Sequence, residues 1–351
     1  MNLNDFDFLL PEKLIALRPV RPRTSSRLLV AKSGSFVDAN FFQLKSFLRP
    51  GDRLVFNNTK VLKSLLLVTR IRQVSDTFHE AKVQINLLEK ISDRLWKVLA
   101  KPLRKLKSGD FLKLSDGHVV LVKSVENNHA VIDLQYDKNS NIESFLNLSG
   151  RMPLPPYILR NRESDSDDDV DYQTIFASIV GSVAAPTASL HFDDTILSDL
   201  NEIGIDFSYL TLHVGGGTFL PIKSENIADH LMHSEKGYIS QKTAMEINQT
   251  KQAGGRIIAV GTTSARLLEA AASNDYCSAF DDETNIFIKP GYRFNLVDGL
   301  ITNFHLPKST LIMLVAAIIG VEECKKLYSH AIQKKYRFYS YGDSSLLFKK
   351  S

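Results

Sequence analysis

The sequence has few cysteines, and nothing in their placement suggests a metal site or a disulfide framework. Only Cys277 and Cys324 occur among 351 residues, and they are too far apart in the chain for a CxxC motif. The longest apolar run, residues 311–321, includes a glycine and is too short to span a bilayer. The first residues are acidic and lack the apolar core of a signal peptide. We therefore predict a cytoplasmic protein without a membrane segment.

Motifs for nucleotide and metal binding are also missing. The three consecutive glycines 215–217 do not have the spacing of a P-loop or of a dinucleotide fingerprint. His230 and His233 could bind a metal from one helical turn, but no third histidine or cysteine is near them. The acidic segment 163–171 lacks the glycine and the glutamate of an EF-hand loop. We expect no metal, and we interpret the acidic segment as a solvated loop that faces away from any nucleic acid.

Charge is ordinary in amount and uneven in distribution. The net charge is +4, yet residues 60–123 hold 14 Lys/Arg and 6 Asp/Glu, an excess of 8, so the remainder carries 4 − 8 = −4. A basic segment on an acidic body favours a polyanionic partner for that segment, although a lysine-rich solvated surface gives the same pattern. The four arginines of Arg18–Arg27 could line an anion site or lie in a solvated loop.

The period of the apolar residues divides the chain. Between residues 61 and 142 it is two, with turn signals between short runs, which predicts a small β-barrel or sandwich. The expected strands are Leu62–Arg72, Ala81–Leu88, Leu95–Ala100, Phe111–Leu114, Val119–Val125 and Ala130–Tyr136. Before and after this segment, strands alternate with helical patterns. A chain of this length is typical of two domains. We predict an α/β fold with helices on both faces of a mixed sheet, formed by residues 1–60 and 150–351, and an inserted β-barrel domain of residues 61–149.

A short amphipathic helix is expected near Pro11, and the α/β part should contain several strand–helix pairs. The expected strands are Leu28–Val30, a buried strand after Gly51, Phe207–Val214, Arg256–Val260 and Leu300–Phe304. The expected helices are Ile196–Ile203, Gln241–Ala253, one after Ser264, Leu311–Ile319 and Val321–Lys335. Ser309 or Thr310 offers the N-cap hydroxyl of the helix from Leu311, which is apolar on every side and must be buried.

Three histidines fall in or near turns at strand ends: His191, His213 and His305. A histidine can exchange a proton near neutral pH, but each of these could equally be a hydrogen-bonded structural residue. Two helix starts follow strands, one at Gly261–Ser264 and one beside Lys308, and both are candidate anion sites. Asn57–Thr59 places polar groups at the end of another strand, where α/β proteins often contact ligands.

Taken together, these motifs resemble the S-adenosylmethionine:tRNA ribosyltransferase-isomerases of queuosine biosynthesis over the whole chain. The matching blocks are Ser26–Val30, Gly51–Asp52, Val55–Asn57, Met152–Ile158, Tyr172–Thr174, Gly181–Ala188, Leu190–Phe192, Thr211–Gly215, Gly217–Phe219, His230, Met232–Glu235, Ala259–Ser264, Pro290–Phe294, Leu300–Leu311 and Tyr336–Asp343. So many blocks in the family's order make the resemblance highly specific.

The resemblance implies an α/β domain interrupted by a β-barrel, and it implies a reaction. The ribosyl part of S-adenosylmethionine is transferred to 7-aminomethyl-7-deazaguanine at the tRNA wobble position and isomerises to epoxyqueuosine, releasing adenine and methionine. The expected partners are this tRNA and S-adenosylmethionine as co-substrate, with no metal, and we expect a monomer. A non-catalytic tRNA-binding protein and an ordinary methyltransferase are the alternatives.

The resemblance also suggests roles for individual residues. His191, His213 and His305 would make the proton transfers, without a choice of which is the base. Substrate contacts are expected from Arg27, Asn57, Thr59, Thr187, Gly215, Gly217, Thr218, Thr262, Thr263, Ser264, Arg266, Tyr292, Arg293, Lys308 and Ser309. The basic loop with Arg104, Lys105 and Lys107 is expected to contact tRNA phosphates, although a solvated loop is the alternative.

This chain departs from the family pattern at several positions. Asn58 and Lys60 stand where Asp and Arg are usual, Arg151 replaces a common His, Ser189 a common Gly, and Ile179–Val180 an acidic-proline pair. An amide cannot act as a base as a carboxylate can, so Asn58 is not a catalytic candidate.

Overall fold

The computed structural model describes residues 2–32, 34–74, 76–136, 141–215, 227 and 232–350. Its larger sheet runs, in spatial order, through β18 (Phe280–Thr284), β14 (Glu235–Ile239), β13 (Asp206–Leu212), β3 (Arg53–Asn57), β15 (Ile257–Val260), β19 (Gly299–Asn303), β20 (Ser344–Phe348), β1 (Arg27–Lys32) and β2 (Ser35–Asn40). The central strands β13, β3, β15 and β19 are mutually parallel, so their carboxyl ends meet at one edge of the sheet. This edge positions the candidate site.

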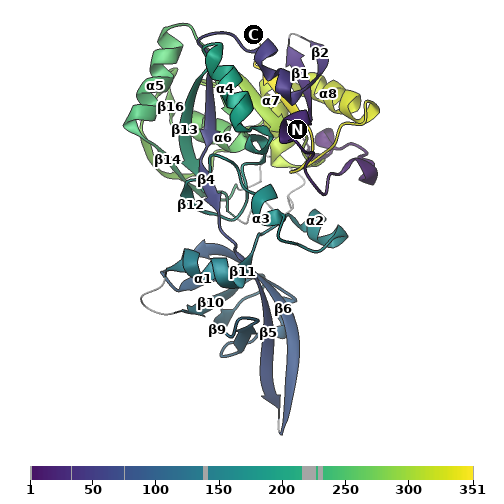
Figure 1. Cartoon of the computed structure of the whole chain (residues 1–351), viewed down its shortest axis with the longest axis vertical. Coiled ribbons are helices and arrows are strands. Elements are labelled where there is room, and N and C mark those ends of the chain that lie inside the picture. Colours follow the sequence, from purple (N-terminus) through teal and green to yellow (C-terminus); the bar gives the residue numbers. More distant parts are fainter. Residues whose placement is uncertain are drawn as a thin grey trace.

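Helices cover both faces of the larger sheet (Figure 1). One face packs against α5 (Gln241–Gln252), α6 (Thr262–Ala270), α7 (Thr310–Ile319) and α8 (Val321–Gln333). The other packs against the 3₁₀ segment η4 (Phe41–Phe47) and α4 (Asp194–Glu202). The 3₁₀ segment η6 (Thr187–His191) lies against β19. The predicted fold class, a mixed sheet between helices, is confirmed.

The most apolar helix, α7, starts where the sequence predicts. Its N-cap is Ser309, whose hydroxyl accepts a hydrogen bond from the N–H of Ile312 at 3.4 Å. Most of its side chains are buried, because apolar residues on every side leave no polar face for solvent. No helix in the described part of the chain is long and apolar enough to cross a membrane.

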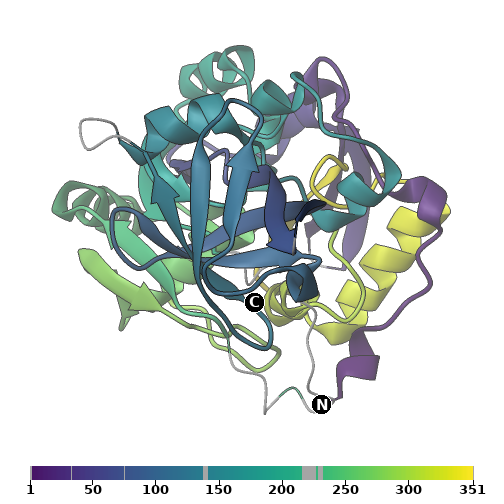
Figure 2. The ribbon, with the colours of Figure 1, turned by 90° about the horizontal axis from the view of Figure 1, so that it is seen from below.

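The second sheet closes on itself as a barrel. Its strands are β5 (Leu65–Val74), β6 (Thr77–Lys90), β7 (Leu95–Lys101), β10 (Ala130–Gln135), β9 (Val119–Val125) and β8 (Phe111–Leu114), and β8 pairs back to β5. Alternate residues such as Val68, Val98 and Ile132 point inward and form a separate apolar core. Figure 2 views the molecule from the barrel end and shows these strands in front of the larger sheet.

Two short segments connect the barrel to the rest of the molecule. β4 (Thr59–Val61) follows β3 and pairs with β12 (Ile179–Ser182), while β11 (Gly150–Arg151), after α1 (Ile142–Ser149), pairs with β5. A Cβ at Gly150 would lie 1.9 Å from the carbonyl oxygen of Lys63, so only glycine allows the two connections to pass. The barrel therefore joins the larger sheet at the carboxyl ends of its parallel strands (Figure 1). The division into domains at residues 60 and 150 stays a prediction.

Three sequence predictions differ from the structure. In place of one helix near Pro11 there are two 3₁₀ turns, η1 (Leu3–Phe6) and η2 (Glu12–Leu14). Strands β2, β14, β18 and β20 were not predicted. The remaining elements are η3 (Arg23–Ser25), η5 (Leu103–Lys105), α2 (Pro156–Asn161), α3 (Asp168–Asp171), β16 (Ala272–Ser273) and β17 (Tyr276–Cys277).

The third difference concerns the acidic segment, and the prediction of a solvated loop is wrong. Asp168 and Asp171 in α3 are buried, and both lie within ion-pair distance of Arg18. Arg21 and Arg23 also pair with Asp171. The arginines of residues 18–23 thus find their anions within the chain, because a buried carboxylate is tolerated only when it is paired and hydrogen-bonded.

Candidate active site

The three histidines all lie at the edge formed by the carboxyl ends of the parallel strands. His213 directly follows β13, and His305 lies two residues after β19. His191 ends η6, which packs against β19. Because β3 and β15 separate β13 from β19, His213 stands three strand spacings, about 14 Å, from the β19 end. The edge therefore holds two histidines close to β19 and one at the end of β13.

Hydrogen bonds fix the ring of His191 at both nitrogens. Its Nδ1 lies 2.8 Å from the hydroxyl of Ser26, and its Nε2 lies 3.2 Å from the amide nitrogen of Asn303. The amide oxygen of Asn303 accepts a hydrogen bond from Thr187 Oγ1 at 2.9 Å, so its NH₂ group faces the histidine. Nε2 is then the acceptor, and Nδ1 carries the proton.

The electrostatic surroundings keep His191 neutral. Burial, followed by the positive charges of Arg23 and Arg337, lowers the pKa of His191 to about 3. A cavity of about 10 Å³ lies beside it, lined in part by Arg23, Ser26 and Tyr341. This volume is close to that of a single water probe, so the cavity has no room for a larger ligand. In this conformation His191 holds the β19 end together rather than facing an open space.

His305 is similarly enclosed. Its Nε2 lies 2.8 Å from Thr302 Oγ1, and its backbone N–H donates to the hydroxyl of Tyr328 at 3.0 Å. Burial lowers the pKa of His305 to about 3. The side chain is therefore neutral at pH 7, like that of His191.

His213 differs from the other two because it is only half-buried. Its Nδ1 lies 2.8 Å from the hydroxyl of Thr59, and burial lowers its pKa. Gly181 packs directly against the imidazole, since a Cβ there would come 2.7 Å from Cε1 of the ring. Among the described residues, no side chain hydrogen-bonds to its Nε2. His213 thus has one fixed and one open nitrogen.

The neighbouring Asn57 joins the ends of β3 and β13. Its amide nitrogen donates to the carbonyl of Leu212 at 2.9 Å, and its amide oxygen accepts from the N–H groups of Leu212 and Thr59. The residue is fully buried. This saturated amide holds Thr59, and through it His213, in position.

The start of α6 has the features predicted for an anion site. The N-cap is Gly261, so no side chain caps the first N–H groups of the helix. Ser264 is buried and donates its hydroxyl to the carbonyl of Val260 at 3.0 Å. Thr262 is also buried, and the hydroxyl of Thr263 is buried without a hydrogen-bond partner among the described residues. A free hydroxyl beside free helix N–H groups suits a polar or anionic ligand.

One turn further along α6, Arg266 pairs with Glu235 of β14. The other carboxylate oxygen of Glu235 accepts the N–H of Gly215 at 3.1 Å. The Nη2 of Arg266 is buried and lacks a hydrogen-bond partner among the described residues. This chain of contacts ties α6 to the segment that follows His213. Gly217 and Thr218, which were also predicted to bind substrate, lie outside the described residues.

Other predicted site residues are engaged elsewhere. The hydroxyl of Tyr292 donates to Glu269 near the end of α6, toward the opposite edge of the sheet, and the exposed Arg293 is next to it in the chain. Lys308 forms an ion pair with Asp7 at 2.9 Å. Arg27 donates to the carbonyl of Lys334 at 2.7 Å, and its guanidinium lies over the ring of Tyr336.

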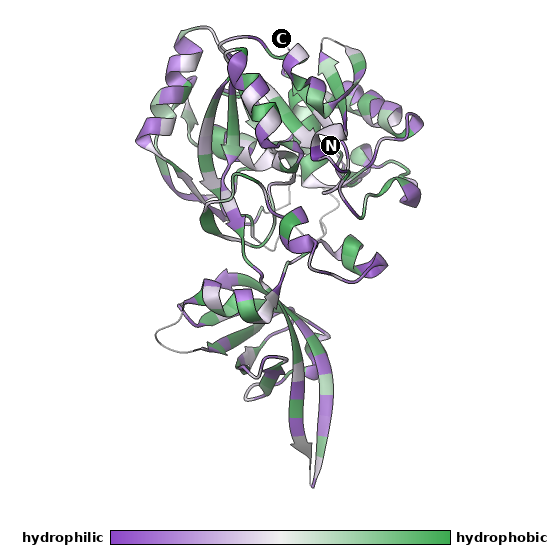
Figure 3. Cartoon of the chain, viewed as in Figure 1, coloured by the Kyte–Doolittle hydropathy of each residue, from purple (hydrophilic) through white to green (hydrophobic). Residues whose placement is uncertain are grey.

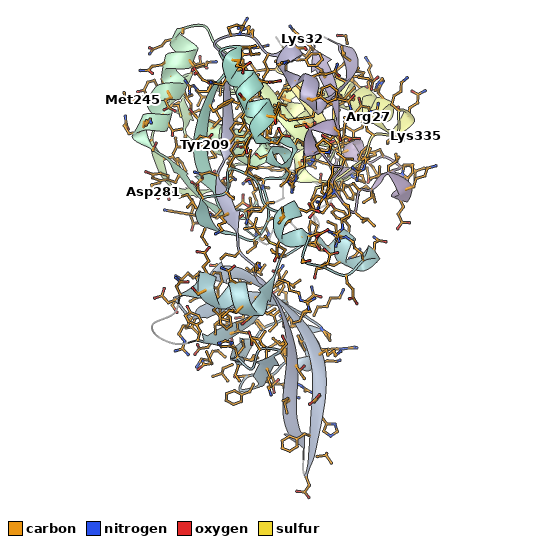
Figure 4. All side chains as sticks on the ribbon, in the orientation of Figure 1. Arg27, Lys32, Tyr209, Met245, Asp281 and Lys335 are labelled. Atoms are coloured by element: carbon orange, nitrogen blue, oxygen red, sulfur yellow. The ribbon has the colours of Figure 1, made fainter. Side chains whose placement is uncertain are left out.

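Figure 4 shows Arg27 on the same side of the larger lobe as Lys335, away from the strands that lead to the barrel. Ser309 serves as the cap of α7. The structure therefore brings the α6 start, Arg266 and Thr59 to the histidine edge. It leaves Tyr292 and Arg293 apart from them, and it engages the side chain of Arg27 with Lys334 and Tyr336.

Comparison with known proteins assigns the family. Residues 3–347 match the model of a family described as queuosine biosynthesis protein. A relative from Ruegeria pomeroyi is 50% identical over 347 residues, 99% of each chain, and one from Zymomonas mobilis is 47% identical over 352 residues, the full length of both. The chain belongs to the queuosine biosynthesis family. Both relatives are named S-adenosylmethionine:tRNA ribosyltransferase-isomerase.

A solved family structure has the same architecture. The crystal structure of S-adenosylmethionine tRNA ribosyltransferase from Thermotoga maritima covers 97% of this chain and 99% of its own, with a TM-score of 0.54 and 29% identity. In the described residues of the present chain, no group of three or more His, Cys, Asp or Glu residues could hold a metal ion. His230, considered with His233 as a ligand pair, lies outside the described residues.

The structure shows the local consequences of two departures from the family pattern. Asn58 accepts a hydrogen bond from Thr211 Oγ1 at 2.7 Å through its amide oxygen, a role that needs only an acceptor and that a carboxylate would also fill. Ser189 is fully buried, and its hydroxyl has no hydrogen-bond partner among the described residues. The serine therefore adds an unsatisfied hydroxyl where the usual glycine has none.

Sequence reasoning missed the residues that orient the histidines. Ser26 and Asn303 hold His191, and Thr302 holds His305. All three stand inside blocks that resemble the family. A histidine at a strand end needs hydrogen-bond partners to orient its ring. Those partners come from other turns, and the sequence alone does not show which turns lie next to each other.

Proposed function

We propose that the protein is an S-adenosylmethionine:tRNA ribosyltransferase-isomerase that acts on 7-aminomethyl-7-deazaguanine at the wobble position of tRNA. The supporting observation is the match of nearly the whole chain to relatives of that name at about half identity. Such coverage leaves no part of the relatives' chains without a counterpart here, which favours an enzyme over a non-catalytic tRNA-binding protein. The reaction would release adenine and methionine.

Within this reaction, His213 is the histidine best suited to accept a proton. When its Nδ1 donates to Thr59 Oγ1, its Nε2 carries a lone pair that accepts no hydrogen bond from a described side chain. The acidic C–H next to the sulfonium of S-adenosylmethionine requires such a base. Hydrogen bonds hold His191 at both ring nitrogens and His305 at Nε2, and burial lowers the pKa of each to about 3, so these two buried residues act as positioning residues in this scheme.

The α6 start supplies the polar contacts for the co-substrate. The free N–H groups after Gly261 and the unpartnered hydroxyl of Thr263 would hold the methionine carboxylate or the ribose hydroxyls. The charge of Arg266 is paired with Glu235, but its unpartnered Nη2 adds a hydrogen-bond donor behind them. This role takes the place of the one predicted for Lys308, whose charge is neutralised by Asp7.

Product analysis tests the proposed function. Purified protein is incubated with S-adenosylmethionine and tRNA that carries 7-aminomethyl-7-deazaguanine, and small molecules are separated by chromatography. Adenine and methionine are expected in equal amounts. S-adenosylhomocysteine would identify a methyltransferase, and intact S-adenosylmethionine would identify a non-catalytic binder. His213→Ala should abolish adenine release while His233→Ala, an exposed histidine beyond β13, retains it.

The proposal also covers the domain division, the tRNA contact, the cellular compartment and the oligomeric state. We propose that residues 61–149 are a separate tRNA-contacting domain, since the barrel has an apolar core of its own. Arg104, Lys105 and Lys107 are exposed on and after η5, and their side chains form no ion pair with the described residues, which supports phosphate contact. The protein would work in the cytoplasm as a monomer.

A further inference from the structure

The barrel exposes large apolar side chains on its outer surface. Phe78 is 69% and Phe111 59% exposed, and Ile71 on the strand between them is 37% exposed. Along β5 the side chains alternate, so that Val68 points into the barrel and Ile71 points outward. Single exposed apolar residues are common, but a group on neighbouring strands marks an interaction surface.

The strand register places these residues side by side. Ile71 pairs with Phe111 of β8, and Phe111 pairs with Leu121 of β9, which forms one row across the outer surface. Figure 1 shows the β5–β6 hairpin extending beyond the rest of the barrel, and Figure 3 shows apolar and polar residues alternating along both strands. Phe78 lies on β6 near the end of this hairpin.

The next row toward the larger sheet is basic. Thr69 pairs with Lys82 of β6 on one side and with Lys113 of β8 on the other. Both lysines are exposed and form no ion pair with the described residues, whereas Lys123 of β9 lies 3.5 Å from Asp133. One acidic residue, Glu80, pairs with Ile71 at the β6 end of the apolar row. We call Ile71, Phe78, Lys82, Phe111 and Lys113 the outer face.

We propose that the outer face is a docking surface for the tRNA, in which Lys82 and Lys113 contact phosphates and Phe78 and Phe111 contact the faces of bases or riboses. This inference rests on the proposed function, which makes tRNA the substrate. Uncompensated lysines beside exposed aromatic rings are the combination that binds RNA backbone and stacks on bases. In a two-fold contact with a second copy of the chain, the lysines of the two copies would face each other and repel. Self-association through this face is therefore disfavoured.

The outer face lies away from the candidate active site. Ile71 stands six residues along β5 from Leu65, where the barrel joins the sheet, which corresponds to about 20 Å. Contacts at this distance hold the tRNA without touching the reacting nucleotide. Removing them should therefore raise the KM for tRNA and leave kcat and the KM for S-adenosylmethionine unchanged.

Two pairs of substitutions in the full-length protein test the proposal. Lys82→Glu with Lys113→Glu should weaken tRNA binding at least about tenfold and reduce the slope of log K against log salt by roughly 1.5. Phe78→Ala with Phe111→Ala should weaken binding by about tenfold without changing that slope. The controls are Lys242→Glu with Lys326→Glu on α5 and α8, which change net charge equally, and Phe42→Ala, which removes an exposed phenylalanine on η4.

Affinity for tRNA within twofold of wild type in both outer-face variants would overturn the proposal. An equally large loss of tRNA affinity in the control variants would also overturn it, because the affinity would then depend on net charge rather than on the outer face. A shift in sedimentation of the wild type that the outer-face variants abolish, with tRNA affinity intact, would assign the surface to self-association instead. Wild-type adenine release reports separately on the proposed function, because it does not depend on where the tRNA docks.

Discussion

The sheet edge and the barrel surface handle their polar and charged side chains in opposite ways. At the edge, most groups have partners within the chain: His191 has two, and Asp168 has both Arg18 and Arg162. On the barrel, Lys82 and Lys113 extend into solvent with no carboxylate partner among the described residues. Charges that are paired internally fix a geometry, whereas charges left unpaired remain free for an external anion.

The difference shows why local charge in a sequence is a poor guide to partners. Residues 18–27 and residues 101–107 are both basic. Arg18, Arg21 and Arg23 are neutralised by the buried carboxylates around α3, whereas Arg104 and Lys105 are not neutralised by any described residue. Four variants test this contrast, and their expected effects on stability decrease from Asp168→Ala to the triple substitution in the 104–107 loop.

Asp168→Ala should cause the largest loss. It leaves the guanidinium of Arg162, which donates to Asp168 at 2.8 and 2.5 Å, and that of Arg18 without their shared carboxylate. Removing one partner of a buried ion pair costs about 3–5 kcal/mol of unfolding free energy, measurable by urea denaturation. The matched control is Asp167→Ala, whose side chain is 68% exposed and 3.9 Å from Arg21. If both variants changed the unfolding free energy by a similar small amount, the buried ion pairs around Asp168 would not fix the geometry as we infer.

Gly181→Ala tests the packing around His213. The new Cβ would lie 2.7 Å from Cε1 of the imidazole, so the ring must move away from Thr59. Such overpacking costs about 1–3 kcal/mol, and misplacing a proton acceptor should reduce kcat by on the order of 100-fold. Steady-state adenine release measures the second effect. A normal kcat in a folded variant would remove His213 from the mechanism.

The buried histidines predict the pH dependence of stability. Their pKa values fall from 6.5 to about 3 on folding, so the unfolded chain takes up protons that the folded protein does not. The contribution of the two histidines to the unfolding free energy should be fully present above pH 6.5 and should be lost as the pH drops toward 3. The slope is up to about 1.4 kcal/mol per pH unit for each histidine. His191→Gln should flatten the slope by that amount in urea titrations, and His79→Gln on the exposed hairpin is the control. An unchanged slope would show that folding does not lower the pKa of His191.

The triple substitution of Arg104, Lys105 and Lys107 by Ala should leave stability unchanged. Their side chains are exposed and form no ion pair with the described residues, so their loss should change the unfolding free energy by less than about 0.5 kcal/mol. If the loop contacts tRNA, the salt slope of binding should fall by roughly 2 to 3. Filter binding across a salt series measures it. An unchanged slope would leave this loop as a solvated surface.

Most of the secondary structure could be predicted, and the exceptions share a cause. The strands at β3, β15 and β19 and helices α5, α7 and α8 follow from runs of apolar residues with clear caps and breaks. Strands β14 and β20 were missed. β14 begins with glutamate, lysine and glycine in succession, which gives no strand pattern, and it is held as a strand by its pairing with β13 and β18. β20 has only three apolar residues in succession, and it is held as a strand by its pairing with β19 and β1.

For the candidate site, the sequence supplied the residues but could not place them. It indicated that His191, His213 and His305 stand at strand ends, because a strand end is a local pattern. It could not tell that Tyr292 reaches the opposite end of α6, or that Asp7 neutralises Lys308, because these contacts join segments far apart in the chain.

The family resemblance, the α/β and barrel periodicities and the capped start of α7 could be recognised from the sequence, since each depends on residues close together along the chain. The folded arrangement was needed to show which arginines are neutralised, which histidine is only half-buried and which lysines remain unpaired. These properties are set by desolvation and by partners brought together in space. Neither can be read from a residue and its neighbours in sequence.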